Sequence, residues 1–386
     1  MRSGIDKKML TILVLFDFSK AFDCVNHSLL LQKLRNLNFS CTSLNWFHSY
    51  LNGRRQSVKD SNGNLSEWAS ISSGVPQGSV LGPLLFSLYV RDLSVCIQKC
   101  KYMMYADDLQ IYIHCHSHDF PETIRLINDD VSAIVTWAHD NFLKINSNKT
   151  KAMIIGHSRV ISRLNTNNLP KIEVQGISIP YSTTAKNLGV IFSDTLSWKH
   201  HISLVSNKVN ATLHQLKLHK NLFPTHVRSQ LVSSLIFPHF DYCCLVFYDL
   251  TAELNIKLQR LMNSSIRFIY NLQRDEHITP YINKLSWMDI KTRRKFKLAC
   301  FMYSLLKINE PQYIIDLFPK RTIMPNVVTR AEADYIHVSH YRTTAFHRSF
   351  TVAASQIWNN LPKLIKDSTS LKVFRKKLYP FLNSPD

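Results

Sequence analysis

The stretch Tyr105-Ala106-Asp107-Asp108 decides the fold, because it separates two apolar runs, Lys101–Tyr105 and Leu109–Ile113. Two short apolar runs joined by a tight polar connection predict a β-hairpin, here with two carboxylates at its tip. Upstream, Asp17 ends another apolar run, Leu10–Phe16, which predicts a buried strand with an acid at its mouth. Paired aspartates also occur in ordinary turns, where a carboxylate caps backbone N–H groups, so this stretch alone does not establish a function.

The three aspartates Asp17, Asp107 and Asp108 form a candidate metal site. Clustered carboxylates repel one another unless cations neutralise them. Their hard oxygen atoms suit Mg²⁺, and two such ions about 4 Å apart can bind the attacking and leaving oxygens of an in-line phosphoryl transfer. The sequence therefore predicts that these residues hold two Mg²⁺ ions, for which Mn²⁺ could substitute.

Four further segments accompany Tyr105–Asp108 in a fixed order along the chain. They are Phe16–Asp23 with Val25-Asn26-His27, Gly74–Pro83, Asn148-Lys149-Thr150, and Leu188–Phe192 followed by Leu196-Ser197-Trp198 and His201-Ile202. In this order and at this spacing the five segments resemble the palm motifs of non-LTR (LINE-type) retrotransposon reverse transcriptases, and most closely the jockey-like branch. The strong similarity covers about residues 8–205, and Trp358–Pro362 resembles the tail of such proteins less specifically.

The resemblance implies that Asp17, Asp107 and Asp108 are the metal ligands and, with Lys149, the catalytic residues. Lys149 would protonate the leaving pyrophosphate or pair with its phosphates. A lone lysine near a loop is more often simply solvated, and this alternative stays open for Lys149.

Four residues, Phe18, Phe22, Gln77 and Gly78, would bind the incoming nucleotide. Phe22 lies five residues after Asp17, where the family places the side chain that crowds a 2′-OH, so a bulky ring there would favour deoxynucleotides. Gln77 would face the nucleotide or template. Without the resemblance, Phe22 is equally consistent with a core aromatic residue and Gln77 with an ordinary turn residue.

The predicted nucleic-acid contacts are Arg54, Arg55, Leu188 and Gly189. The two arginines precede a strand-like hairpin, Gln56–Lys59 to Trp68–Ser72, and would contact template phosphates. Leu188 and Gly189 lie in the segment that resembles the primer grip. The alternative for Arg54 and Arg55 is that they are two solvated surface residues.

The charge of the chain is unevenly distributed. Its formal net charge is +20; residues 1–160 carry 17 basic and 13 acidic side chains, whereas residues 161–386 carry 30 and 14. This pattern suits a polymerase whose C-terminal part binds a polyanionic duplex. The alternative explanation of the positive charge is a basic, soluble surface without a nucleic-acid partner. The eight cysteines match neither a disulfide framework nor a zinc ribbon. We therefore expect an intracellular protein, nuclear or cytoplasmic, without a signal peptide or membrane span.

The pattern along the chain predicts an α+β fold. We expect a right-hand polymerase palm over residues 1–205, a helical thumb-like region over 206–290, and a basic, mostly helical C-terminal region over 291–386. A fingers region is expected to be largely absent, because the chain begins just before the first motif. The predicted elements include helices His27–Leu37, Thr42–Leu51, Ser79–Leu93 and Pro121–Leu143, and strands Lys151–Ile155 and Lys186–Phe192.

The sequence thus predicts an RNA-directed DNA polymerase of a non-LTR retrotransposon. Its partners would be an RNA template, a DNA primer or target, and dNTPs. One alternative is a catalytically inactive, truncated remnant that only binds nucleic acid. An RNA-dependent RNA polymerase would share the acids but is disfavoured by Phe22, and an unrelated calcium-binding or structural protein is the remaining alternative. The sequence leaves the oligomeric state open.

Overall fold

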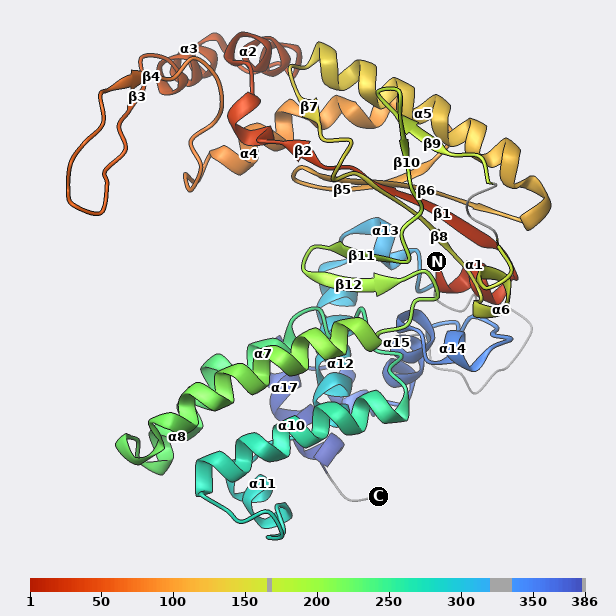
Figure 1. The fold of residues 1–386 in the computed structure, drawn as a ribbon. Coiled ribbons are helices and arrows are strands. Elements are labelled where there is room, and N and C mark those ends of the chain that lie inside the picture. The colour runs from red at the N-terminus through yellow and green to blue at the C-terminus, as the bar shows by residue number, and fades with distance from the viewer. Residues whose placement is uncertain (165–168, 320–334, 384–386) are drawn as a thin grey trace. The chain divides into compact units, whose positions relative to one another are not determined.

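The computed structural model describes residues 1–164, 169–319 and 335–383 and divides the chain into two compact units (Figure 1). The first unit comprises Met1 and Ser3–Leu196, and the second comprises Arg2 and Ser197–Asp386. The α+β fold class is confirmed, because the first unit contains a β-sheet with helices and the second is helical. The predicted boundaries at residues 205 and 290 stay predictions.

A four-stranded antiparallel sheet forms the centre of the first unit. Its order is β5-β6-β1-β8, with β1 (Leu10–Leu15), β5 (Lys101–Tyr105), β6 (Asp108–Cys115) and β8 (Lys151–Ile155). β1 is apolar except for Thr11 and buried except at Leu15, as expected for a strand with a neighbour on each side. The predicted hairpin is confirmed: Tyr105 pairs with Asp108, so Ala106 and Asp107 form a two-residue turn.

Helices cover one face of this sheet, and α5 (Phe120–Asp140) lies along it in Figure 1. The apolar residues of α5 recur every three or four positions, which places them on one stripe. The predicted helix Pro121–Leu143 is confirmed but shorter, because Asn141 caps Trp137 through its side chain and Phe142 adopts a φ of +56°. The buried stripe shares a core with Ile12 and Val14 of β1 and consists of Ile124, Ile127, Val131 and Ile134.

The other elements of the first unit are short or flank the sheet. The helices are α1 (Arg2–Asp6), α2 (His27–Asn36), α3 (Cys41–Leu51), α4 (Gly82–Tyr89) and α6 (Ser158–Ile161), with single 3-10 segments at Ala21–Cys24, Arg91–Cys96 and Ser117–Asp119. The two-stranded ladders are β2 (Phe18–Ser19) with β7 (Lys144–Ile145), β3 (Arg55–Gln56) with β4 (Ala69–Ser70), β9 (Ile172–Val174) with β10 (Ile177–Ile179), and β11 (Thr184–Asn187) with β12 (Val190–Ser193).

One predicted helix begins later than expected. The helix predicted over Ser79–Leu93 starts at Gly82, because the Ser79 hydroxyl donates to the carbonyl of Pro76 (2.7 Å) and accepts from the backbone N–H of Gly82 (2.9 Å). These two bonds keep residues 79–81 in a turn. α4 then ends at Tyr89 and a 3-10 segment follows.

The prediction of a single strand over Lys186–Phe192 is wrong. Leu188 and Gly189 have φ values of +44° and +79° and form the turn of the β11–β12 hairpin, in which Asn187 pairs with Val190. Two central residues with positive φ match the right-handed twist of the flanking strands. Glycine takes this conformation readily, whereas leucine does so only under tertiary constraint.

Backbone hydrogen bonds join the loop before α2 to the loop before α4. The N–H of Gly74 donates to the carbonyl of Val25 (2.7 Å), and the N–H of Val75 donates to the carbonyl of Phe22 (2.9 Å). We call this pair of bonds the Gly74 clasp. Gly74 has a φ of +88°, and a Cβ at this position would lie 2.9 Å from the Cα and carbonyl oxygen of Asp23. Glycine is therefore required here both by the dihedral angle and by the close approach of two backbones.

The second unit is helical throughout its described part. Its α12 (Ile290–Ile308) contacts α10 (Ala252–Tyr270), α15 (Phe350–Asn359) and α17 (Leu371–Asn383), which explains why α12 is buried on several sides. α7 (Lys199–Leu218) and α8 (Thr225–Leu235) pack against α10. The remaining helices are α9 (Phe237–Asp241), α11 (Thr279–Leu285), α13 (Gln312–Ile315), α14 (Thr344–His347) and α16 (Lys363–Lys366), with a 3-10 segment at Lys220–Leu222.

The helical pattern predicted after Trp198 is confirmed for the residues that the structure describes, whereas residues 320–334 lie outside them. Within the described ranges, no helix combines the length and the hydropathy needed to cross a membrane.

We predict that Gly74→Ala destabilises the protein by about 3 kcal/mol, because its methyl group would meet backbone atoms that cannot move aside. The matched control is Gly176→Ala, since Gly176 also has a positive φ (+74°) but nothing within 4 Å of the added Cβ. That variant should lose about 1 kcal/mol from the dihedral alone. Urea unfolding measures both values, and equal losses would contradict the importance of the clasp.

Candidate active site

The register of β1 and β6 brings the three predicted acids, Asp17, Asp107 and Asp108, to the same end of these two neighbouring strands. We call this end of the sheet the acidic edge. Leu15 of β1 is opposite Gln110 of β6, and the antiparallel pairing continues as the N–H of Phe16 donates to the carbonyl of Leu109 (2.9 Å). Asp17 and Asp108 therefore follow on neighbouring strands, and Asp107 lies in the adjoining turn.

The carboxylates of this edge act on one another electrostatically. The pKa of Asp108 is raised above its usual value, first by partial burial and then by the negative charges of Asp107 and Asp17. Both causes disfavour the ionised form of Asp108, and a bound cation would oppose them. The electrostatics of this edge of the sheet therefore favour a positively charged ligand.

The donor chemistry fits a divalent cation, but the side chains do not converge on one point. Among the described residues, no group of three or more His, Cys, Asp or Glu side chains is placed to hold a metal ion. The side chain of Asp17 is 41% exposed and is held by no close ion pair, its nearest partner being the amine of Lys149 at 4.0 Å. Metal ligation at Asp17, Asp107 and Asp108 accordingly requires rotation of accessible carboxylates and stays a prediction.

The loop that carries Lys149 is attached to the backbone of Asp17. The N–H of Asn146 donates to the carbonyl of Asp17 (2.7 Å), and the side-chain oxygen of Asn146 accepts from the N–H of Lys149 (3.2 Å). The hydroxyl of Thr150 accepts from the N–H of Asp17 at 3.4 Å. These bonds place Lys149 near Asp17, where its side chain is 70% exposed, and its catalytic role stays a prediction.

Two further lysines lie at this edge that the sequence analysis did not identify. A small pocket of about 90 Å³ is lined by Asp17, Asp108 and Lys149 and also by Lys151 of β8 and Lys186 of β11. The two strands contact each other, which brings lysines 35 positions apart to one place. Nothing local to either residue signals this, because it follows from the strand arrangement.

A larger pocket, of about 420 Å³, joins three of the four predicted nucleotide-binding residues to an acid. Phe22, Gln77 and Gly78 line it together with Asp107. Lys20, which the sequence analysis passed over, lines it as well, and its signal was its place inside the motif Phe16–Asp23. We call this the Phe22–Gln77 pocket.

The walls of the Phe22–Gln77 pocket are held by specific contacts. The ring of Phe22 stacks on Phe86 of α4, with centroids 4.3 Å apart and planes 20° apart. The side-chain amide of Gln77 donates to the Asp23 carboxylate at 2.9 Å. Because the Gly74 clasp joins the same two loops, Phe22 and Gln77 are fixed relative to each other by both backbone and side chains.

Phe18 does not belong to this pocket. It pairs with Ile145 in the β2–β7 ladder, and its side chain is 8% exposed within the core of the first unit. The side chain of Phe18 therefore packs in the core, and its predicted contact with the nucleotide stays a prediction.

None of the four predicted nucleic-acid residues lines either pocket, although Leu188 directly follows Asn187, which lines the small one. Arg54 packs its guanidinium over the ring of Tyr50 (5.4 Å), which in turn stacks on the exposed Trp46 (5.6 Å). Arg55 lies in β3, in the hairpin that extends away from the rest of the first unit in Figure 1. Leu188 and Gly189 form the β11–β12 turn.

Comparison with known proteins identifies the family of the first unit. Residues 2–192 match the family model described as "Reverse transcriptase (RNA-dependent DNA polymerase)". The chain is 28% identical over 281 residues to the probable RNA-directed DNA polymerase from transposon X-element of Drosophila melanogaster, covering 69% of this chain and 29% of that protein. It is 23% identical over 273 residues to the RNA-directed DNA polymerase from mobile element jockey of Drosophila funebris, covering 68% and 28%.

A third relative is a putative 115 kDa protein in the type-1 retrotransposable element R1DM of Drosophila melanogaster, 25% identical over 66% of this chain and 24% of that protein. Among solved structures, apo telomerase from Candida tropicalis aligns with a TM-score of 0.41 and 13% identity over 82% of this chain and 54% of that one. The matched region spans less than a third of each of the three transposon relatives. The family match, with relatives named from three non-LTR elements, shows that residues 2–192 belong to the reverse transcriptase family, as a domain of the LINE type.

Proposed function

We propose that this chain contributes the polymerase part of a non-LTR retrotransposon protein, which copies an RNA template into DNA. The reaction joins the α-phosphorus of a dNTP to the 3′-oxygen of a DNA primer and releases pyrophosphate. The observation that carries the proposal is the Phe22–Gln77 pocket, which joins a candidate sugar-sensing ring, a polar side chain and Asp107 in one cavity.

The acidic edge would supply the metal ligands. Asp17, Asp107 and Asp108 would hold two Mg²⁺ ions, which when bound neutralise charge on the reacting oxygens and lower the pKa of the attacking hydroxyl. The raised pKa of Asp108 supports this role, because repulsion among the carboxylates is relieved by a cation.

The lysines around the acidic edge would bind the phosphates. Lys149 lies 4.0 Å from Asp17, and Lys151 and Lys186 line the same small pocket. A cluster of ammonium groups attracts the triphosphate and stabilises the negative charge that develops on the leaving pyrophosphate. Lys149 is our candidate for the proton donor, since its loop is hydrogen-bonded to the backbone of Asp17.

The nucleic-acid partners would contact basic and aromatic surfaces. Arg54 and Arg55 would contact template phosphates, and the exposed stack of Trp46, Tyr50 and Arg54 offers a planar surface to unpaired bases. The turn Leu188-Gly189 would contact the primer. The Asn187 side chain donates to that of Gln110 (3.2 Å), which attaches this turn to the strand that carries Asp108.

We predict that Asp107→Asn lowers primer extension on an RNA template by roughly 1,000-fold or more, because it removes a ligand on which transition-state stabilisation depends. Asp140→Asn, at the end of α5, is the matched control and should extend normally. Unchanged extension by Asp107→Asn would refute the proposed site. A folded wild type that binds nucleic acid without synthesis would instead favour the inactive remnant.

We predict that Phe22→Val relaxes discrimination between dNTPs and the corresponding rNTPs by about 10- to 100-fold, because a smaller side chain leaves space for a 2′-OH. Single-nucleotide incorporation with each substrate measures the ratio. Phe86→Leu is the control, since Phe86 supports the Phe22 ring without lining the pocket. If Phe86→Leu reduced the preference for dNTPs over rNTPs as much as Phe22→Val does, a loss of rigidity around the pocket would explain both effects, and a steric contact between Phe22 and the 2′-OH would not be needed.

We predict that Mg²⁺ raises the melting temperature of the wild type and that Asp108→Asn loses this response. Because the folded-state pKa of Asp108 lies above the ordinary value of 3.8, its ionisation disfavours the fold. Stability should therefore fall as pH rises through the interval above 3.8, and a cation should restore it. Asp108→Asn should melt higher than the wild type without metal at neutral pH. A lower melting temperature for this variant in thermal scans would contradict the repulsion.

A further inference from the structure

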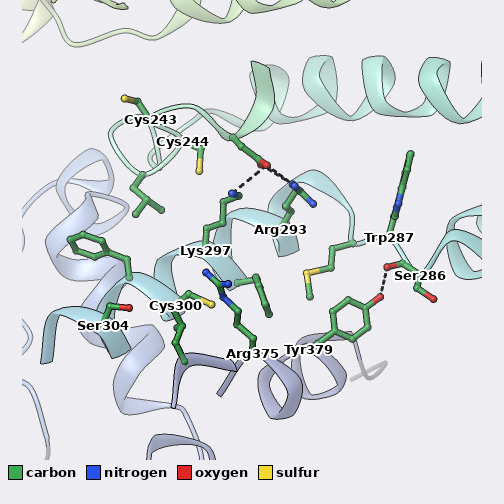
Figure 2. A pocket seen from close by; sticks show the side chains of 16 residues that line it. Cys243, Cys244, Ser286, Trp287, Arg293, Lys297, Cys300, Ser304, Arg375 and Tyr379 are labelled. Carbon is green, nitrogen blue, oxygen red and sulfur yellow. Dashed lines mark hydrogen bonds and ion pairs between the residues drawn. The ribbon is translucent and has the colours of Figure 1, made fainter. Parts of the chain in front are cut away.

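A pocket of about 720 Å³ lies within the second unit, where α12 and α17 meet the segment 241–245 (Figure 2). Pockets of roughly 300–1,000 Å³ are of the size that holds a small ligand or part of a larger one. Its lining residues fall between Asp241 and Tyr379, so it is formed within one compact unit. We call it the α12–α17 pocket, and it shares no residue with the Phe22–Gln77 pocket.

Three cations line the α12–α17 pocket, and they outnumber the acids. Arg293 donates two hydrogen bonds to Asp241 (2.7 and 2.5 Å), and the amine of Lys297 lies 3.2 Å from the same carboxylate. Figure 2 marks these contacts with dashed lines. The third cation, Arg375 of α17, lies against the thiol of Cys300. With Asp241 as the acid among the lining residues, the pocket carries a net charge of about +2 and favours an anion.

The two helices that form the pocket extend this positive field. α12 carries six lysines and arginines and α17 carries four, and neither helix contains an acidic residue. An anion of extended length, with charges beyond the one that enters the pocket, would therefore be attracted along both helices. This pattern favours a polyanion over a small free anion.

The rest of the lining mixes apolar side chains with polar ones such as Ser286 and Ser304, and specific contacts hold its walls in place. Tyr379 of α17 donates to the carbonyl of Ser286 (2.6 Å), which ties α17 to the segment before α12. Trp287 packs on Phe237 with ring centroids 4.5 Å apart, and the guanidinium of Arg293 lies 4.4 Å from the Phe237 ring. The apolar side chains that line the pocket include Trp287, Phe296, Phe301 and Leu371.

Three thiols line the pocket, and two of them, Cys244 and Cys300, are buried. Burial raises the pKa of Cys244 to about 11, and it also raises the pKa of Cys300. Both are therefore thiols at neutral pH, and a thiol is a weak nucleophile compared with a thiolate.

We propose that the α12–α17 pocket binds single-stranded nucleic acid, with a phosphate on Lys297 and Arg375 and an unpaired base against the apolar lining near Trp287. A duplex offers only its phosphates to such a cavity, because its bases are paired and stacked, whereas a single strand can insert a base beside an aromatic ring. The site lies outside residues 2–192 and does not depend on the polymerase activity proposed above.

The test uses the full chain and a fluorescently labelled short single-stranded RNA, with a duplex of the same length for comparison. The variant Lys297→Gln with Arg375→Gln should weaken single-strand binding about 20-fold at ~0.1 M salt, since each lost phosphate contact accounts for roughly fivefold there. It should also reduce the salt dependence of single-strand affinity, and it should affect the duplex less. Fluorescence anisotropy over a salt series measures all three quantities.

The matched control is Lys372→Gln with Lys376→Gln, which removes the same charge from exposed positions, both on α17 and outside the pocket lining. Equal weakening by the two double variants would overturn the proposal in favour of a diffuse basic surface. If Lys297→Gln with Arg375→Gln weakened single-strand and duplex binding equally, the proposed insertion of an unpaired base into the pocket would be wrong.

A second variant tests the pocket in the opposite direction. Asp241→Asn removes the carboxylate that competes with a bound phosphate for Arg293 and Lys297, so single-strand binding should become severalfold tighter. Thermal unfolding verifies that this variant is folded. A folded Asp241→Asn protein that binds single strands no more tightly than the wild type would contradict the placement of the phosphate.

Discussion

The pairing of β1 with β6 is the constraint on which the rest of the first unit depends. A shift of one residue in this register would turn every side chain of β1 to the opposite face of the sheet. The observed register buries Ile12 and Val14 against the helices and simultaneously places Asp17 beside Asp108. The packing of the hydrophobic core therefore fixes the strand register, and the strand register fixes where the acids lie.

Positively charged side chains accompany the acids at this end of the sheet. The pKa of Asp108 is raised by burial and then by Asp107 and Asp17, and Asp108 lines a pocket with Lys149, Lys151 and Lys186, which come from three different segments of the chain. Charges of both signs therefore gather in one small pocket, and its cations suit a phosphate-bearing substrate. The same charged residues therefore bear on both the stability of the fold and the proposed function.

The sequence predicts local features of this protein well and long-range ones poorly. The hairpin around Asp107 and the amphipathic helix α5 follow from periodicity within a short window. The Leu188-Gly189 turn was missed, because an apolar run with one glycine predicts a strand as readily as a turn. Phe18 was placed in the site by its motif position, although alternation along β2 turns it into the core. The α12–α17 pocket could not be predicted, since its cations join only when distant helices pack.

The Gly74 clasp has a consequence for how such a domain can change over time. Its two bonds run between main-chain atoms, which every amino acid except proline supplies, so they persist when most side chains on either loop are replaced. Gly74 itself cannot be replaced in this way, because the methyl group of an alanine would collide with the backbone of Asp23. A pocket held by such backbone bonds can keep its shape while many of the surrounding side chains change, provided that position 74 remains glycine.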